Sequence, residues 1–326
     1  MNARWFASSI VALALPLTLS AQSGSKTPIP RTADRRPDLQ GMWTNQTLTT
    51  LERPPALAGK ATLTDQEAAA YAREFLESSS TDRRDGGAQA DVNRAYPDYF
   101  IDRGTELARV NNERRTSLIT DPADGRIPYR SDRGPRRGDG RPTGDQSNNY
   151  DNPEARPLAE RCLLSFGSSS GPPMLPVLYN NHYRIVQTPT AVMIEVEMVH
   201  DVRIIHLDGR PHLPKSVRRW LGDSIGHWEG DALVVDTTNF AEQVSFRGAS
   251  PDLHVVERFE FIDAKTLSYR FTVDDPSTFA RPWSGEIPIR ATDDQMYEYA
   301  CHEGNHALES ILRGARFEEK AAGQRP

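Results

Sequence analysis

The sequence predicts a mainly β protein in which an antiparallel meander closes into a lipocalin-like or similar barrel. About eight segments between residues 183 and 302 alternate apolar and polar residues, as half-buried strands do. Turn signals such as "HLDGRPH" and "WEGDA" separate many of them. Such a sheet avoids exposed edges by closing on itself, and a barrel of about eight strands is either filled by side chains or holds one small ligand.

The first twenty residues are predicted to be a cleavable export signal, residues 1–20. Arg4 precedes the apolar run "WFASSIVALALPLTL", and small and polar residues follow it, which is the order typical of a signal peptide. The run is too short to span a bilayer comfortably and contains Pro16; an uncleaved anchor is the alternative. We therefore expect a periplasmic or secreted protein with no membrane span in its mature form.

The next segment, residues 21–155, is predicted to be an irregular extension with one helix near residues 64–79. It has few apolar runs and many Arg, Asp, Gly and Pro residues. In "TLTDQEAAAYAREFLESS", Thr64 and Glu67 form a capping box, and apolar residues follow at helical spacing. Residues 156–326 then form the barrel-like domain, which ends in the helix "NHALESILRGARFEEK".

Charge and cysteine content limit the partners and the compartment. The formal net charge of −6 argues against nucleic acid as the main partner, because binding phosphates requires a basic surface. The chain has two cysteines, Cys162 and Cys301. Because an exported chain meets an oxidising environment, we predict a disulfide between them, with two buried free thiols as the alternative.

One stretch, "ACHEGNHALES", contains the H-E-x-x-H signature of zinc peptidases at His302, Glu303 and His306. In those enzymes both histidines lie one turn apart on a continuous helix. Here the residues before His302 alternate like a strand, and Gly304 and Asn305 follow, a helix breaker and a favoured N-cap. We therefore expect the helix to begin after Glu303, and we predict no metal site. Glycine-rich nucleotide-binding motifs are also absent from the sequence, so no cofactor is predicted.

Two polar residues on apolar strand faces are the main catalytic candidates. In "AVMIEVEMVHD" the even positions are apolar and His200 continues their face, so it is predicted to point inward. In "LHVVERFEF", Glu257 shares a face with four apolar residues. An inward histidine and glutamate could serve as base and acid, since burial moves both pKa values toward neutrality. The alternative is that Glu257 pairs with Arg203 or Arg258 and only fixes the register.

Other polar and aromatic residues of the strand-rich half complete the predicted site. His302 or Tyr299 is expected to supply a supporting proton donor at the barrel rim, where functional groups are often placed. Arg203 would orient an anionic or carbonyl group of the substrate. His227, Trp228 and Tyr269 are predicted to line the cavity.

These candidates predict an exported enzyme that performs cofactor-free acid–base chemistry on a small organic molecule in the barrel. Lyase, isomerase or hydratase reactions fit, since they need positioned proton donors and acceptors but no covalent nucleophile. A non-enzymatic periplasmic binding protein is one alternative. A metal-dependent hydrolase that uses His200, His302 and a carboxylate is another.

Several blocks of the chain are distinctive, among them "GPPMLP", "YNNHYRIVQTP", "WLGDSIGHWEGDALVVDTTNF", "FTVDDPSTFARPWSGEIP" and "YEYACHEGN". They resemble blocks of a widespread family of exported bacterial proteins of unknown function. The resemblance covers nearly all of the predicted mature chain. It implies that the N-terminal extension belongs to the protein, and it brings no activity, fold or catalytic residue with it.

Overall fold

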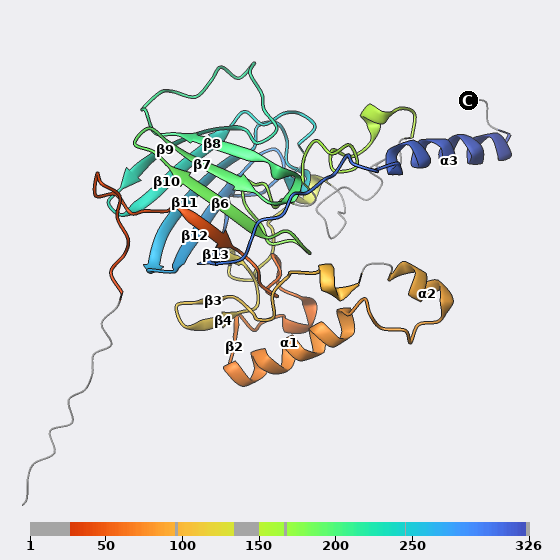
Figure 1. Cartoon of the computed structure of the whole chain (residues 1–326), viewed down its shortest axis with the longest axis horizontal. Coiled ribbons are helices and arrows are strands. Elements are labelled where there is room, and N and C mark those ends of the chain that lie inside the picture. The colour runs from red at the N-terminus through yellow and green to blue at the C-terminus, as the bar shows by residue number, and fades with distance from the viewer. Residues whose placement is uncertain (1–26, 95–96, 134–149, 166–167, 245, 324–326) are drawn as a thin grey trace, which may run out of the picture.

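The structure is a computed structural model that describes residues 27–323, apart from residues 95–96, 134–149, 166–167 and 245. The predicted export signal, residues 1–20, lies outside the described residues. The chain forms a β-barrel with a smaller region of helices and loops beside it (Figure 1). No helix in the described ranges is long and apolar enough to cross a membrane.

Within the described chain, nine strands close into a barrel, which confirms the predicted fold class. Closure comes from β1, which pairs with β6 on one side and with β13 on the other. In order around the barrel, the strands are β1 (Gly41–Thr44), β6 (His182–Gln187), β7 (Ala191–Val196), β8 (Val202–His206), β9 (Asp223–Glu229), β10 (Ala232–Thr238), β11 (His254–Asp263), β12 (Thr266–Asp274) and β13 (Trp283–Ala291).

Three features of the sheet differ from the expected meander. Strands β1 and β5 (Ile119–Asp121) come from the extension, and both pair with β13. Strands β8 and β9 pair in parallel, so the long connection over residues 207–222 crosses between them without a helix. The prediction of a strand at "MYEYACH" is wrong, because residues 292–300 have no regular structure.

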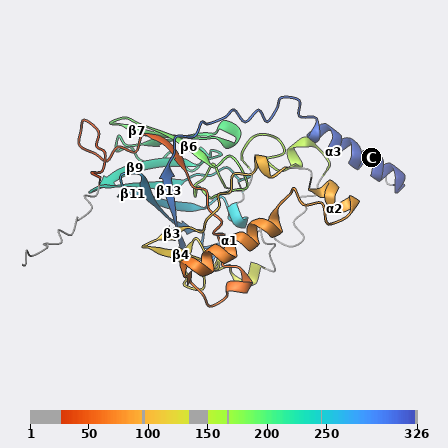
Figure 2. The same ribbon diagram turned by 60° about the horizontal axis from the view of Figure 1, so that its bottom comes forward.

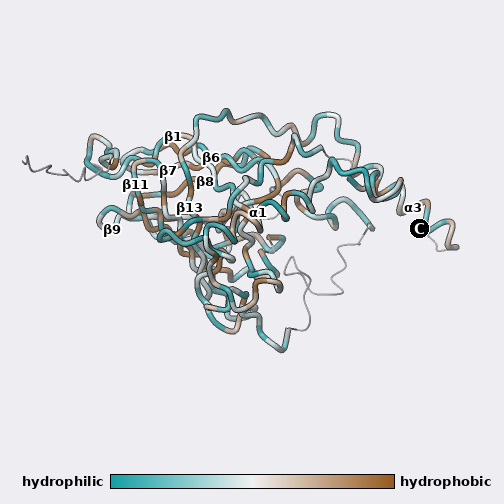
Figure 3. The backbone as a smooth tube through the Cα atoms, turned by 90° about the horizontal axis from the view of Figure 1, so that it is seen from below, coloured by the Kyte–Doolittle hydropathy of each residue, from teal (hydrophilic) through white to brown (hydrophobic). Residues whose placement is uncertain are grey.

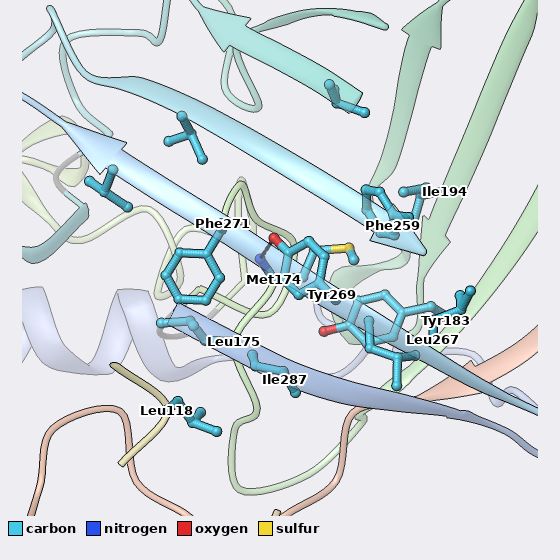
Figure 4. Close-up of a cluster of buried hydrophobic side chains, with 14 of the residues drawn as sticks. Leu118, Met174, Leu175, Tyr183, Ile194, Phe259, Leu267, Tyr269, Phe271 and Ile287 are labelled. Carbon is cyan, nitrogen blue, oxygen red and sulfur yellow. Dashed lines mark hydrogen bonds between the residues drawn. The ribbon is translucent and has the colours of Figure 1, made fainter. Parts of the chain in front are cut away.

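The alternation of apolar residues predicted the inward faces of the strands correctly. Alternate residues of β7, β11 and β12 are buried. Figure 4 shows Phe259, Tyr269 and Phe271 packed with Met174 inside this cluster, and Figure 3 shows that hydrophobic residues concentrate in the barrel. The ring centroids of Phe259 and Tyr269 are 4.9 Å apart. The described interior is therefore filled by side chains.

The region beside the barrel is built around helix α1 (Asp65–Ser79). The predicted capping box is confirmed: the Thr64 hydroxyl accepts from the amide of Glu67, and the Glu67 carboxylate accepts from the amide of Thr64. Figures 1 and 2 place α1 beside a small sheet. That sheet contains β2 (Thr62–Leu63), β4 (Glu113–Arg115) and β3 (Arg109–Val110), and the short helices of this part are η1 (Pro55–Leu57), α2 (Ala88–Asn93), η2 (Asp98–Phe100), η3 (Ser131–Arg133) and η4 (Pro153–Ala155).

The predicted disulfide and the split of the H-E-x-x-H motif are both confirmed. Cys162 and Cys301 are bonded, with their Cα atoms 5.8 Å apart, so the coil after β13 is tied to the segment before β6. Helix α3 (Ala307–Ala321) begins after Glu303, and His306 is its N-cap residue. His302 lies in the preceding turn, so the two histidines do not share a helix face.

Candidate functional site

The prediction that His200 points into the barrel is wrong. Strand β7 ends at Val196, and the short helix η5 (Met198–His200) then turns the chain toward β8. Val199 and His200 both have positive φ, 61° and 45°, so the period of the strand is lost before it reaches the histidine. The His200 side chain is exposed to solvent, whereas Glu257 is fully buried, and the two do not face a common cavity.

The structure does bring together Arg203, Glu257 and Tyr269 in the barrel interior. The two terminal guanidinium nitrogens of Arg203 donate to the two oxygens of Glu257 at 2.5 and 3.0 Å, and the hydroxyl of Tyr269 donates to the same carboxylate at 2.8 Å. Burial and the neighbouring Glu257 charge raise the pKa of Tyr269 well above its usual range. The alternative interpretation of Glu257, an ion pair with Arg203, is confirmed.

The remaining predicted site residues lie apart from this ion pair. His227 is exposed and bonds Glu229, two residues along the same strand. Trp228 is half-buried against the core, and His302 is exposed. Tyr299 lines a separate cavity of about 470 Å³ next to the disulfide. The structure therefore does not assemble the predicted catalytic set.

A different group of ionisable side chains is joined on the outside of the barrel. We call it the His–Asp chain, and it consists of Asp223, His212, Asp236 and His254. His212 lies between two carboxylates, with Nδ1 3.0 Å from Asp223 Oδ2 and Nε2 2.9 Å from Asp236 Oδ1. The other oxygen of Asp236, Oδ2, is 2.9 Å from Nε2 of His254. Two imidazoles thus share one carboxylate.

The register of the sheet explains how Asp236 meets His254. Asp236 on β10 lies opposite Val256 on β11, so His254 is its diagonal neighbour on the same outward face. Both residues alternate with buried neighbours along their strands. Asp274 on β12 lies opposite His254 and extends this polar row to a third strand. His212 reaches the row from the connection between β8 and β9.

Asp223 anchors that connection to the barrel. Its side chain has no exposed surface, and it accepts from the amide of Leu213, from His212 and from Arg210. Burial acts to raise the pKa of Asp223, but the hydrogen bonds from Leu213 and His212 and the nearby Arg210 charge lower it below its usual value. Asp223, the buried end of the His–Asp chain, is therefore held as a carboxylate.

His254 is the solvent-accessible end of the His–Asp chain. Its side chain is 38% exposed, and its Nε2 is taken up by Asp236. Among the described residues it has no other hydrogen-bond partner, so Nδ1 is the nitrogen left to face solvent. A carboxylate that fixes one imidazole nitrogen while the other faces outward is the usual arrangement of a catalytic acid or base.

A surface cavity of about 640 Å³ lies next to the Asp223 end of the His–Asp chain, where Arg219 contributes to its lining. Arg219 lines this cavity, is half exposed, and has its Nη1 3.9 Å from Asp223 Oδ1. Arg218 and Trp220 belong to the same lining. The lining also contains one carboxylate, Glu242. Two guanidinium groups against one carboxylate, with an indole ring beside them, suit an anionic molecule with a flat apolar part.

Sequence reasoning did not assign the His–Asp chain a role, although Asp223 and Asp236 stand in a segment rich in acidic residues. The alternation of apolar and polar residues was the one signal that could have found them, since it places Asp236 and His254 on the polar faces of their strands. Alternation identifies a face, but only the register shows which residues on neighbouring faces meet.

The interaction between His254 and Asp236 should make the stability of the protein depend on pH. The hydrogen bond to Asp236 raises the pKa of His254 above its usual value of 6.5, although burial opposes this. The folded chain then holds the proton more tightly than the unfolded chain, so this stabilisation is complete below about pH 6.5 and is lost as pH rises through the folded-state pKa. Because both side chains are 38% exposed, solvent screening keeps the effect modest.

We expect the difference in unfolding free energy between the wild type and His254→Gln to shrink as the pH rises above about 6.5. Urea titrations over a series of pH values measure it. Asp236→Asn, which removes the charge that raises the pKa, should lose the same pH dependence. A difference that stays constant across this range would contradict the assignment.

Comparisons of the chain with protein-family models, with curated proteins and with solved structures each found no match.

Proposed function

We propose that this protein is an enzyme that performs acid–base chemistry on a small anionic organic molecule, of the lyase, isomerase or hydratase type. The observation that carries the proposal is the His–Asp chain, in which Asp236 holds Nε2 of a solvent-reached His254. These reaction types need a proton donor or acceptor in a fixed position, and they need neither a covalent nucleophile nor a cofactor. The proposed site lies outside the barrel, because the described interior is filled.

The electrostatics of His254 suit this role. Its hydrogen bond to Asp236 raises its pKa from 6.5, so the pKa moves toward the pH at which many enzymes work. In the protonated form its Nδ1 can donate to a leaving group, and in the neutral form it can accept a proton from carbon. His212 would hold Asp236 from the other side and keep that carboxylate oriented.

The cavity supports an anionic substrate. Arg219 is half exposed and its Nη1 lies 3.9 Å from Asp223 Oδ1, so a carboxylate bound there would lie at the Asp223 end of the His–Asp chain. Arg218 is held by the carbonyl oxygens of Phe240 and Pro251, which fixes one side of the lining. A fixed and a movable guanidinium together favour a carboxylate or phosphate over a neutral ligand.

The test is proton exchange with solvent. The purified protein is incubated in D₂O with a panel of small carboxylic, keto and hydroxy acids, and the loss of carbon-bound hydrogen is followed by proton NMR. For any acid that the wild type acts on, His254→Gln should lower the rate by about 10²–10⁴-fold. Arg219→Gln should instead raise KM with a smaller change in kcat.

His227→Gln is the matched control, since His227 is an exposed histidine of strand β9, two strands away from β11, and is paired with a carboxylate of its own strand. It should leave both constants unchanged. Equal exchange rates in the wild type and in His254→Gln would contradict the proposal.

We also propose that the protein works in the periplasm or outside the cell. The disulfide between Cys162 and Cys301 supports an oxidising compartment, where such bonds persist.

A further inference from the structure

Three acidic side chains surround one histidine at the start of β6, away from the proposed acid–base site. His182 is almost buried, and its Nδ1 lies 2.8 Å from Glu197 Oε2 and 3.8 Å from Asp102 Oδ2. Its other nitrogen, Nε2, is 3.4 Å from Asp294 Oδ2. The facing atoms of Asp102, His182 and Glu197 all lie within 4.8 Å of one another.

We propose that Asp102, His182 and Glu197 form a binding site for one divalent transition-metal ion. Ligands about 2.0–2.2 Å from such an ion, at tetrahedral or octahedral angles, are roughly 3.0–3.5 Å apart. The two spacings from Nδ1 of His182, 2.8 and 3.8 Å, bracket that value. One imidazole and two carboxylates suit zinc and its first-row neighbours, and three protein ligands leave a position for water.

The charge around the site favours binding of a cation. Even a protonated His182 leaves three carboxylates against a single positive charge. Among the residues that the structure describes, no lysine or arginine nitrogen lies within 4.0 Å of Asp102, Glu197 or Asp294. The buried carboxylate of Glu257, in contrast, has Arg203 beside it. The side chain of Glu197 is 3% exposed, and a buried carboxylate is costly unless a cation neutralises it.

The outer contacts hold each ligand in place, as they do in metal sites. With Nδ1 on the metal, the Nε2–H of His182 would donate to Asp294, which is a common outer partner of a metal-bound histidine. Asp102 accepts from the backbone and side-chain nitrogens of Asn181. Glu197 accepts from the amide of Tyr297, in the coil that follows β13. The ion would therefore tie the N-terminal extension to β6 and to the turn that follows β7.

The experiment is zinc binding by the purified, tag-free protein. After equilibration with Zn²⁺ and gel filtration, metal analysis should find close to one equivalent per chain. Asp102→Asn and Glu197→Gln keep the shape of each side chain but replace an anionic ligand oxygen with a neutral amide, and each should weaken the affinity by about 100-fold or more. Asp102 is partly exposed, so its variant is expected to fold even if the Glu197 variant does not.

A control removes two exposed histidines that have the spacing of zinc ligands. His302→Gln with His306→Gln eliminates the exposed H-E-x-x-H stretch and should leave the stoichiometry and affinity unchanged. In the wild type, Co²⁺ in place of Zn²⁺ should give the visible absorption of a nitrogen–oxygen site, which tests the ligand set without a variant. Less than a tenth of an equivalent of zinc, or binding lost in this double variant and kept in Asp102→Asn, would overturn the proposal.

Discussion

Replacing Glu257 with glutamine should lower the free energy of unfolding by about 3–5 kcal/mol. The side chains of Arg203 and Glu257 are 2% and 0% exposed and form two hydrogen bonds with each other. Glutamine has the same shape but no charge, so the guanidinium would stay buried without a counter-ion. Tyr269 would also lose its charged acceptor. Urea unfolding followed by tryptophan fluorescence measures the change.

A double variant separates the ion pair from the packing. Arg203→Met combined with Glu257→Leu removes both charges and fills the space with apolar atoms, so it should recover most of the lost stability. Glu229→Gln, which breaks an exposed pair with Arg258, should leave the urea midpoint where it is. A loss below about 1 kcal/mol for the Glu257 variant would show that the interior tolerates the bare cation.

Replacing Trp283 with alanine should cost about 3–5 kcal/mol of stability. Trp283 is fully buried at the first position of β13, and its ring packs against Phe246, Phe271 and Phe279. Removing the indole would leave a cavity among three aromatic rings that cannot collapse around it. Differential scanning calorimetry or urea titration measures the loss.

Trp283→Phe is the informative comparison. The indole Nε1 is buried and has no hydrogen-bond partner among the described residues, so phenylalanine removes an unsatisfied donor while it keeps an aromatic ring. We expect this variant to lose clearly less stability than the alanine variant. Equal losses would show that the whole indole volume, rather than the aromatic ring, holds this part of the core.

Much of the local structure could be predicted from the sequence because it depends on residues close together in the chain. The capping box spans Thr64 to Glu67, and the inward faces of β11 and β12 follow from alternation along each strand. His200 shows the limit of this reasoning. Alternation holds only while the strand continues, and the turn at η5 that ends it carries a buried valine, Val199, with no glycine or proline to signal the turn.

The candidate sites could not be predicted in the same way. Asp236 and His254 are brought together by the pairing register of β10 and β11, and His212 joins them only because β8 and β9 are parallel. The proposed metal ligands likewise come from distant parts of the protein. Asp102 belongs to the extension, His182 to β6, and Glu197 to the turn after β7. None of these contacts connects residues at a fixed spacing in the chain.

By itself, the sequence determined the mainly β class, the helix with its capping box, the faces of the long strands, and the disulfide, for which only one pairing of two cysteines exists. Tertiary structure alone decided which strands are neighbours, that β1 closes the barrel, and which ionisable groups meet. The physical reason is that periodicity and capping are short-range. Strand order and register instead depend on loop closure and on packing summed over the whole sheet.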